Sequence, residues 1–142
     1  MEEDEASVRA FLQEFVTRML ALDGATLAEK LWSQGADCVL VAVGDDDAIV
    51  GSGPVSERYA RAHAAVREGR VRLYEERVLI LAEGQTACAM AKLDTDVFSK
   101  DGRRQSYRNV RVSWVLDRQG DEWRVVHAHY SLPLGGPGGT VG

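Results

Sequence analysis

Two histidines near the C-terminus, His127 and His129, have the spacing that most readily suggests chemistry. Alternate side chains of a β-strand point to one face, so the two imidazoles are expected to lie side by side. Such a pair can bind a metal ion or act as an acid and a base. The sequence places no third ligand at a suitable spacing, and no Ser–His–Asp spacing or glycine-rich phosphate loop stands out. We therefore expect no metal ion and no other cofactor.

A second set of candidates combines polar groups with apolar neighbours on expected strands and on one helix. The set consists of Arg108, Trp114, Tyr130, Tyr59, His63, Leu93 and Val112. Arg108 is in phase with the inward apolar residues of its strand, so it can orient one anionic or carbonyl oxygen of a ligand. Tyr59 and His63, one helical turn apart, can close the same cavity, although a half-exposed helix face explains them equally well. The expected ligand is a small, largely apolar molecule with one polar end.

The elements that carry these residues follow from the periodicity of the apolar side chains. In the N-terminal half, helical spacing predicts helices over 7–22, about 26–34 and about 54–68. Short strands are predicted at 38–43 and 48–50. In the C-terminal half, four long strands are predicted, at about 71–82, 86–98, 104–117 and 122–131.

Turn signals separate the long strands, among them Glu83-Gly84 and Asp101-Gly102. Consecutive strands with short turns pair antiparallel, so the C-terminal half predicts a meander. The predicted class is α+β, with a curved antiparallel sheet wrapped around three N-terminal helices and a pocket between the two layers. Residues 1–134 are expected to form a single domain, and the glycine-rich segment 135–142 a flexible tail.

Composition narrows the classes of partner. The chain has 142 residues, a length typical of one domain, with 45% hydrophobic and 27% charged residues. A formal net charge of −5 argues against a nucleic-acid or anionic-membrane partner, because phosphate groups require a basic surface. No apolar run approaches the roughly 20 residues of a membrane helix. The two cysteines, Cys38 and Cys88, form no metal or redox motif, and a cytoplasmic protein is the expectation.

The last predicted strand carries a more specific pattern. Its sequence is Trp123-Arg124-Val125-Val126-His127-Ala128-His129-Tyr130-Ser131. It resembles the W-x-[IV]-V-H-x-H-x-S ending shared by one SnoaL-like branch and the association (hub) domain of calcium/calmodulin-dependent kinases. The order of elements likewise resembles the cone fold of the nuclear transport factor 2-like, or SnoaL-like, superfamily. Members include isomerases, cyclases, dehydratases and assembly domains, so the fold alone does not settle the function.

The resemblance implies that the outer face of the sheet packs against a second subunit. The residues expected at that interface are Trp123, Val125, His127 and His129. The expected partner is therefore a second copy of the chain, in a homodimer or a ring of dimers. Structural or interface histidines are favoured over catalytic ones on this interpretation.

Departures from active relatives also bear on function. The resemblance implies that ketosteroid isomerase-like members carry an acidic base at the position of Ala42. It also implies a tyrosine at the position of Phe15 or Phe11. Enolisation by those groups is therefore not expected. The resemblance implies that the carboxylate-binding arginines of the hub domain correspond to Leu93, Tyr130 and Val112 in this chain. We expect a hub-like binding or assembly module, and the alternative is a cofactor-free isomerase, cyclase or dehydratase acting on a small apolar carbonyl compound.

Overall fold

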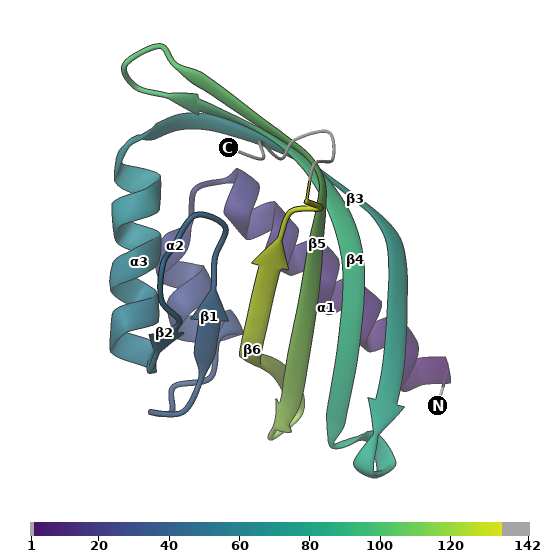
Figure 1. The fold of residues 1–142 in the computed structure, drawn as a ribbon. Coiled ribbons are helices and arrows are strands. Elements are labelled where there is room, and N and C mark those ends of the chain that lie inside the picture. Colours follow the sequence, from purple (N-terminus) through teal and green to yellow (C-terminus); the bar gives the residue numbers. More distant parts are fainter. Residues whose placement is uncertain (1, 135–142) are drawn as a thin grey trace.

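A computed structural model describes residues 2–134, which form a group of helices packed against a curved sheet of six strands (Figure 1). The helical elements are α1 (Glu2–Leu20), α2 (Gly24–Thr26), the π-helical turn η1 (Leu27–Leu31), α3 (Ser52–Ala64) and the short turn η2 (Ala82–Gly84). The strands are β1 (Val39–Val41), β2 (Ile49–Val50), β3 (Val66–Leu81), β4 (Thr86–Ser99), β5 (Arg104–Gln119) and β6 (Glu122–Ser131). The segment 135–142, expected to be flexible, lies outside the described residues.

The strands follow the order β2-β1-β6-β5-β4-β3 across the sheet. Neighbouring pairs from β3 to β6 run antiparallel, which confirms the meander predicted for the C-terminal half. β1 pairs with β6 in the parallel direction, so the sheet is mixed at this junction rather than antiparallel throughout. A long connection through α3 and the meander separates these two strands, and parallel pairing requires such a connection.

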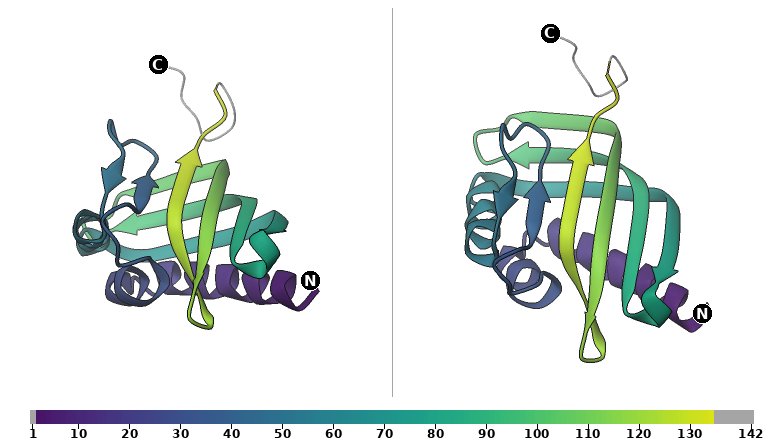
Figure 2. Two further views of the ribbon diagram at one scale, coloured as in Figure 1. Left: turned by 90° about the horizontal axis from the view of Figure 1, so that it is seen from below. Right: turned by 60° about the horizontal axis from the view of Figure 1, so that its bottom comes forward.

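The sheet curves over the helices, with α1 crossing one face and α3 standing at the end that holds β1 and β2 (Figures 1 and 2). On α1, Val8, Leu12 and Phe15 are fully buried and lie at helical spacing. The helix begins at Glu2 rather than near residue 7, and its acidic first turn suits the positive end of the helix dipole. No helix among residues 2–134 is long and apolar enough to span a membrane.

Small side chains on β4 let the helices approach the sheet closely. Ala87, Ala89 and Ala91 alternate along the strand and are all buried, as is Leu93 at the next inward position. The largest fully buried side chains around them are Trp32 and Trp114. The core therefore lies between the inner face of the meander and the helices, which confirms the α+β arrangement.

The third helix ends earlier than its sequence predicts. α3 stops at Ala64, and β3 starts at Val66 instead of near residue 71. The first residue of β3 pairs with Ser99 at the far end of β4. This pairing between distant segments provides hydrogen bonds that a local helix pattern does not reveal.

A β-bulge in β6 changes the face assignment made from the sequence. Leu116 of β5 pairs with Val125, while the preceding β5 residue pairs with His127, so Val126 is the extra residue. Trp123 and Val125 consequently face the core, where they are 5% and 0% exposed. Their assignment to a subunit interface is therefore wrong, because simple alternation fails across an inserted residue.

Candidate functional site

A mostly apolar cavity of about 240 Å³ lies between the inner face of the sheet and α3. Its lining residues are Met19, Leu40, Ala42, Val43, Arg58, Tyr59, Ala62, His63, Val71, Leu93, Thr95, Val97, Tyr107, Val110 and Tyr130. No aspartate or glutamate is among these described lining residues. A larger hollow of about 720 Å³ between α1, η1 and β6 has a charged rim, so the smaller cavity is better suited to an apolar ligand.

Tyr59 from α3 places a hydroxyl group at the buried side of this cavity. The hydroxyl oxygen accepts a hydrogen bond of 2.9 Å from the indole nitrogen of Trp32. Burial raises the pKa of Tyr59, so the phenol keeps its proton at neutral pH. Because its oxygen is used as an acceptor, the hydroxyl proton is available for donation to a ligand.

Tyr130 from β6 is the second phenol of the cavity. Burial raises its pKa far above that of a free tyrosine, and Tyr59 raises it further. The indole of Trp114 only partly opposes this rise. The indole nitrogen of Trp114 is itself buried and has no hydrogen-bond partner among the described residues. The two phenols of the cavity, Tyr59 and Tyr130, are therefore neutral groups that can donate a hydrogen bond.

His63 lies one helical turn beyond Tyr59 on α3, and the two ring centres are 5.9 Å apart. Its Nδ1 is buried without a partner among residues 2–134. Burial lowers the pKa of His63 more than the nearby Leu22 carbonyl and Asp23 raise it. The imidazole is therefore neutral at pH 7.

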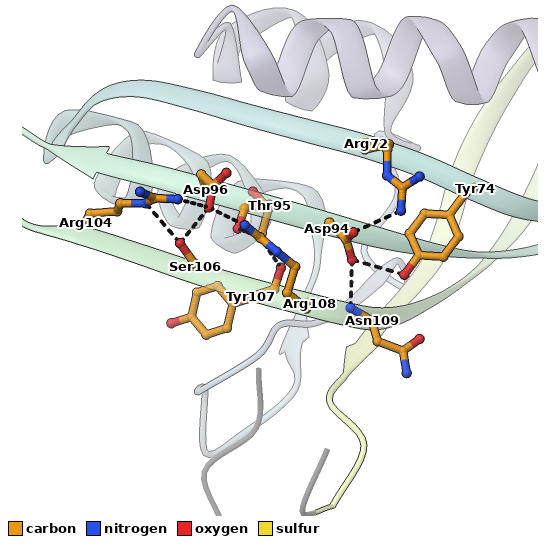
Figure 3. Close-up of polar contacts among 10 residues, drawn as sticks. All are labelled: Arg72, Tyr74, Asp94, Thr95, Asp96, Arg104, Ser106, Tyr107, Arg108 and Asn109. Atoms are coloured by element: carbon orange, nitrogen blue, oxygen red, sulfur yellow. Dashed lines mark hydrogen bonds and ion pairs between the residues drawn. The ribbon is translucent and has the colours of Figure 1, made fainter. Parts of the chain in front are cut away.

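Arg108 lies outside the cavity, so its assignment as the principal cation of the pocket is wrong. Its guanidinium group donates hydrogen bonds of 3.0 Å to the Asp96 carboxylate and 3.2 Å to the Thr95 carbonyl (Figure 3). Ser106 and Arg108 hold the pKa of Asp96 at about 2, well below its usual range. The arginine therefore belongs to a polar network outside the cavity.

A β-bulge in β5 explains this reversal. Asn109 adopts a left-handed conformation with φ of 57°, which asparagine tolerates better than most residues. Its backbone N–H donates to the Asp94 carboxylate over 2.9 Å, and Tyr74 donates to the same oxygen over 3.0 Å (Figure 3). The bulge changes the alternation of β5, so Tyr107 takes the cavity-facing place predicted for Arg108.

The cation at the cavity is Arg58, which the sequence did not single out. Its guanidinium Nε lies 2.9 Å from a carboxylate oxygen of Asp45. The available sequence signal was its place on the predicted helix. Arg58 directly precedes Tyr59 and lies one turn before Ala62, so these residues can line the same cavity. The pairing with Asp45 offsets its charge, so the cavity is close to electrically neutral.

The other predicted lining residues divide into two groups. Leu93 lines the cavity together with Tyr59, His63 and Tyr130. Val112 and Trp114 are each 1% exposed and belong to the core rather than to the cavity lining. No group of three or more His, Cys, Asp or Glu side chains is close enough to hold a metal ion within the described part of the chain.

His127 and His129 lie on the outer face of the sheet, with ring centres 6.4 Å apart. They are separated from the cavity by the sheet itself, because Ala128 and Tyr130 occupy the inward positions of the same strand. The two histidines are therefore not part of the cavity lining.

Comparisons with solved structures show the fold. A proposed dehydratase of the nuclear transport factor 2-like family from Streptomyces avermitilis is 19% identical, with a TM-score of 0.82 over 94% of this chain and 99% of that one. A nuclear transport factor 2-like superfamily protein from Salmonella enterica is 18% identical, with a TM-score of 0.82 over 99% of this chain and 95% of that one. A proposed calcium/calmodulin-dependent protein kinase II association domain from Xanthomonas campestris is 13% identical, with a TM-score of 0.75 over 89% of this chain and 85% of that one.

Sequence comparison adds the family. The search of curated proteins found no matching sequence. The SnoaL-like domain family, in contrast, matches residues 8–135, which include both the cavity and the complete sheet. This chain therefore belongs to the SnoaL-like domain family.

Proposed function

We propose that this chain is a self-associating, hub-like binding module whose cavity takes a small, largely apolar molecule with one hydrogen-bond acceptor oxygen. The observation that carries the proposal is the apolar cavity of about 240 Å³ with the neutral phenols of Tyr59 and Tyr130 in its wall. A neutral carbonyl oxygen satisfies such donors without bringing an unpaired charge into the site. The paired state of Arg58 disfavours a carboxylate at the same place.

The outer face of the sheet supports self-association. Leu79, Cys88, Val115 and His127 form one row across β3 to β6, because each pairs directly with the next. Arg77, Met90, Ser113 and His129 form the neighbouring row. Leu79 and Met90 are 58% and 51% exposed, so apolar surface lies open on the side that the helices do not cover.

These two rows define what we call the outer face, and a second copy of the chain is its proposed occupant. Two copies related by a two-fold axis would bury the same two rows, with the exposed Leu79 and Met90, against each other. His127 and His129 stay in this proposed interface, whereas Trp123 and Val125 are replaced by Leu79, Cys88, Met90 and Val115. A homodimer and a ring of dimers both use such a contact.

Binding of a simple aromatic ketone tests the cavity. α-Tetralone is expected to bind wild-type protein in calorimetry, while the corresponding tetralin carboxylic acid binds more weakly. Tyr130→Phe removes one donor without changing the shape of the cavity, and the affinity is expected to fall by about 3–10-fold. Arg108→Ala is the matched control and leaves the affinity unchanged, because Arg108 lies outside the cavity. Preferred binding of the carboxylate, or dependence on Arg108, would contradict the proposal.

The second candidate function is a cofactor-free isomerase, cyclase or dehydratase. The observation that favours it is the neutral imidazole of His63 in the same cavity as the phenols of Tyr59 and Tyr130. An acceptor of protons next to donors for an oxygen is the minimum requirement for chemistry on a carbonyl compound.

A further inference from the structure

His127 and His129 give the outer face a pair of nitrogen ligands that the cavity does not use. They occupy alternate positions of β6, and their ring centres lie 6.4 Å apart. His129 is exposed and His127 is half-buried, so a metal ion in solution can reach both rings. Side chains two residues apart on a strand share one face, and imidazole nitrogens are common zinc ligands. The pair can therefore contact a single zinc ion.

The surroundings of the two imidazoles carry no charge of their own. The residues paired with the histidines on the adjacent strands β1 and β5 are Val39, Val41, Ser113 and Val115. None of these four neighbours is a carboxylate that could hold an imidazole in an ion pair, and three of them are apolar. Apolar surroundings limit the access of water to a metal site, which favours binding by the protein ligands.

One copy of the chain cannot complete a zinc site at this place. Structural zinc sites have four ligands in a tetrahedral arrangement. No group of three or more His, Cys, Asp or Glu side chains is close enough to hold a metal ion among residues 2–134. β6 is the third of six strands, however, so His127 and His129 lie near the middle of the sheet. A two-fold axis through this region brings the same two imidazoles from a second copy.

We propose that His127 and His129 of two copies together bind one Zn²⁺ ion at the contact between their outer faces. Each copy supplies two nitrogen ligands, at the usual Zn–N distance of about 2.0–2.1 Å. The two rings of one copy must approach slightly closer than 6.4 Å, which a small rotation of these side chains provides. A site made only of nitrogen suits zinc rather than Mg²⁺ or Ca²⁺, which prefer oxygen ligands.

This inference rests on the proposed self-association and adds a ligand that strengthens it. A metal ion held between two copies binds the dimer and not the separate chains, so its binding shifts the equilibrium toward the dimer. The sequence predicted no metal ion because one chain offers no third ligand at a suitable spacing. The second copy supplies the missing ligands.

Zinc titration of protein without a polyhistidine tag tests the site. Metal-free protein is prepared with EDTA, and competition with a chromophoric chelator measures affinity and stoichiometry. One Zn²⁺ per two chains is expected, with no binding of Mg²⁺ at the same concentration. His127→Gln and His129→Gln each remove two of the four ligands, so zinc affinity is expected to fall by at least about 100-fold. The matched control Glu122→Gln removes another exposed ligand-type group from β6 and keeps the affinity.

Sedimentation in zinc or in EDTA separates this inference from the proposed self-association. Zinc is expected to keep wild-type protein dimeric at about 10-fold lower protein concentration than EDTA does. Met90→Glu, the expected monomer, should bind zinc much more weakly because only two ligands remain. A dimer that binds no zinc, one Zn²⁺ per chain, or equal affinity in Met90→Glu monomers would overturn the inference alone. Protein that stays monomeric with and without zinc would overturn the proposed self-association, and this inference with it.

Discussion

The indole nitrogen of Trp32 donates a hydrogen bond of 2.9 Å to the hydroxyl oxygen of Tyr59, which joins the end of η1 to α3. Both rings are buried, at 0% and 8% exposure, and their centres are 6.4 Å apart in an edge-on arrangement. The contact fixes the phenol of Tyr59 beside the cavity with its proton free. The indole of one core residue thus orients a group that can bind a ligand.

Replacing Tyr59 by phenylalanine tests this contact. Tyr59→Phe leaves the buried Trp32 N–H without its partner, so the free energy of unfolding is expected to fall by about 1–3 kcal/mol. Urea denaturation measures the change. Tyr107→Phe, on the opposite wall of the cavity, is the matched control, and a change of similar size there would argue against a special role for the Trp32 contact.

The bulge at Asn109 is expected to require a residue that tolerates a left-handed backbone. Asn109→Val is expected to lower the free energy of unfolding by about 1–2 kcal/mol, because a β-branched side chain clashes with the backbone at positive φ. Asn109→Gly adopts the same conformation without that clash, so its free energy of unfolding is expected to fall much less. Chemical denaturation of the two variants compares them directly, and equal stability would show that the backbone strain is absent.

Protonation of His63 is expected to destabilise the fold. Burial lowers the folded-state pKa of His63 below the ordinary value of 6.5, although Asp23 opposes the effect of burial and Arg58 adds to it. The neutral imidazole keeps the fold at its full stability above pH 6.5, the ordinary pKa of histidine. This stability is lost as the pH falls through that value towards the folded-state pKa. Melting temperatures between about pH 8 and pH 5 should therefore decline in wild type and decline less in His63→Gln.

The carboxylates define a separate pH range. The pKa values of Asp23, Asp94 and Asp96 are lowered, chiefly by hydrogen bonds from neighbouring groups. Their contributions to the free energy of unfolding are present above about pH 4, the ordinary pKa of aspartate. These contributions are lost only as the pH falls further. A decline in melting temperature above pH 5 that is the same in wild type and in His63→Gln would show that protonation of His63 is not its cause.

Self-association is expected to depend on apolar side chains of the outer face. Met90→Glu puts a charge into the proposed contact between two copies, so sedimentation at micromolar concentration should show monomer where wild type shows a dimer or larger ring. Val50→Glu is the matched control, because Val50 is exposed to a similar extent, 53% against 51%, on the far edge strand β2. A wild-type monomer would refute the proposed interface.

Much of the fold follows from local patterns. Apolar spacing predicts α1, and strict alternation along β4 predicts which of its residues face the helices, as the buried Ala87, Ala89 and Ala91 show. The short turns predict the antiparallel meander. These features depend on the periods of helix and strand, which neighbouring residues determine by themselves.

The contents of the cavity depend on two inserted residues that alternation does not reveal. One bulge lies at Asn109, where a backbone N–H is held by Asp94, a residue of the neighbouring strand. It puts Tyr107 in the cavity and Arg108 outside. The other bulge, at Val126, keeps Trp123 in the core while His127 faces outward. Because one extra residue reverses the faces of every position beyond it, contacts between distant strands decided which side chains reach the site.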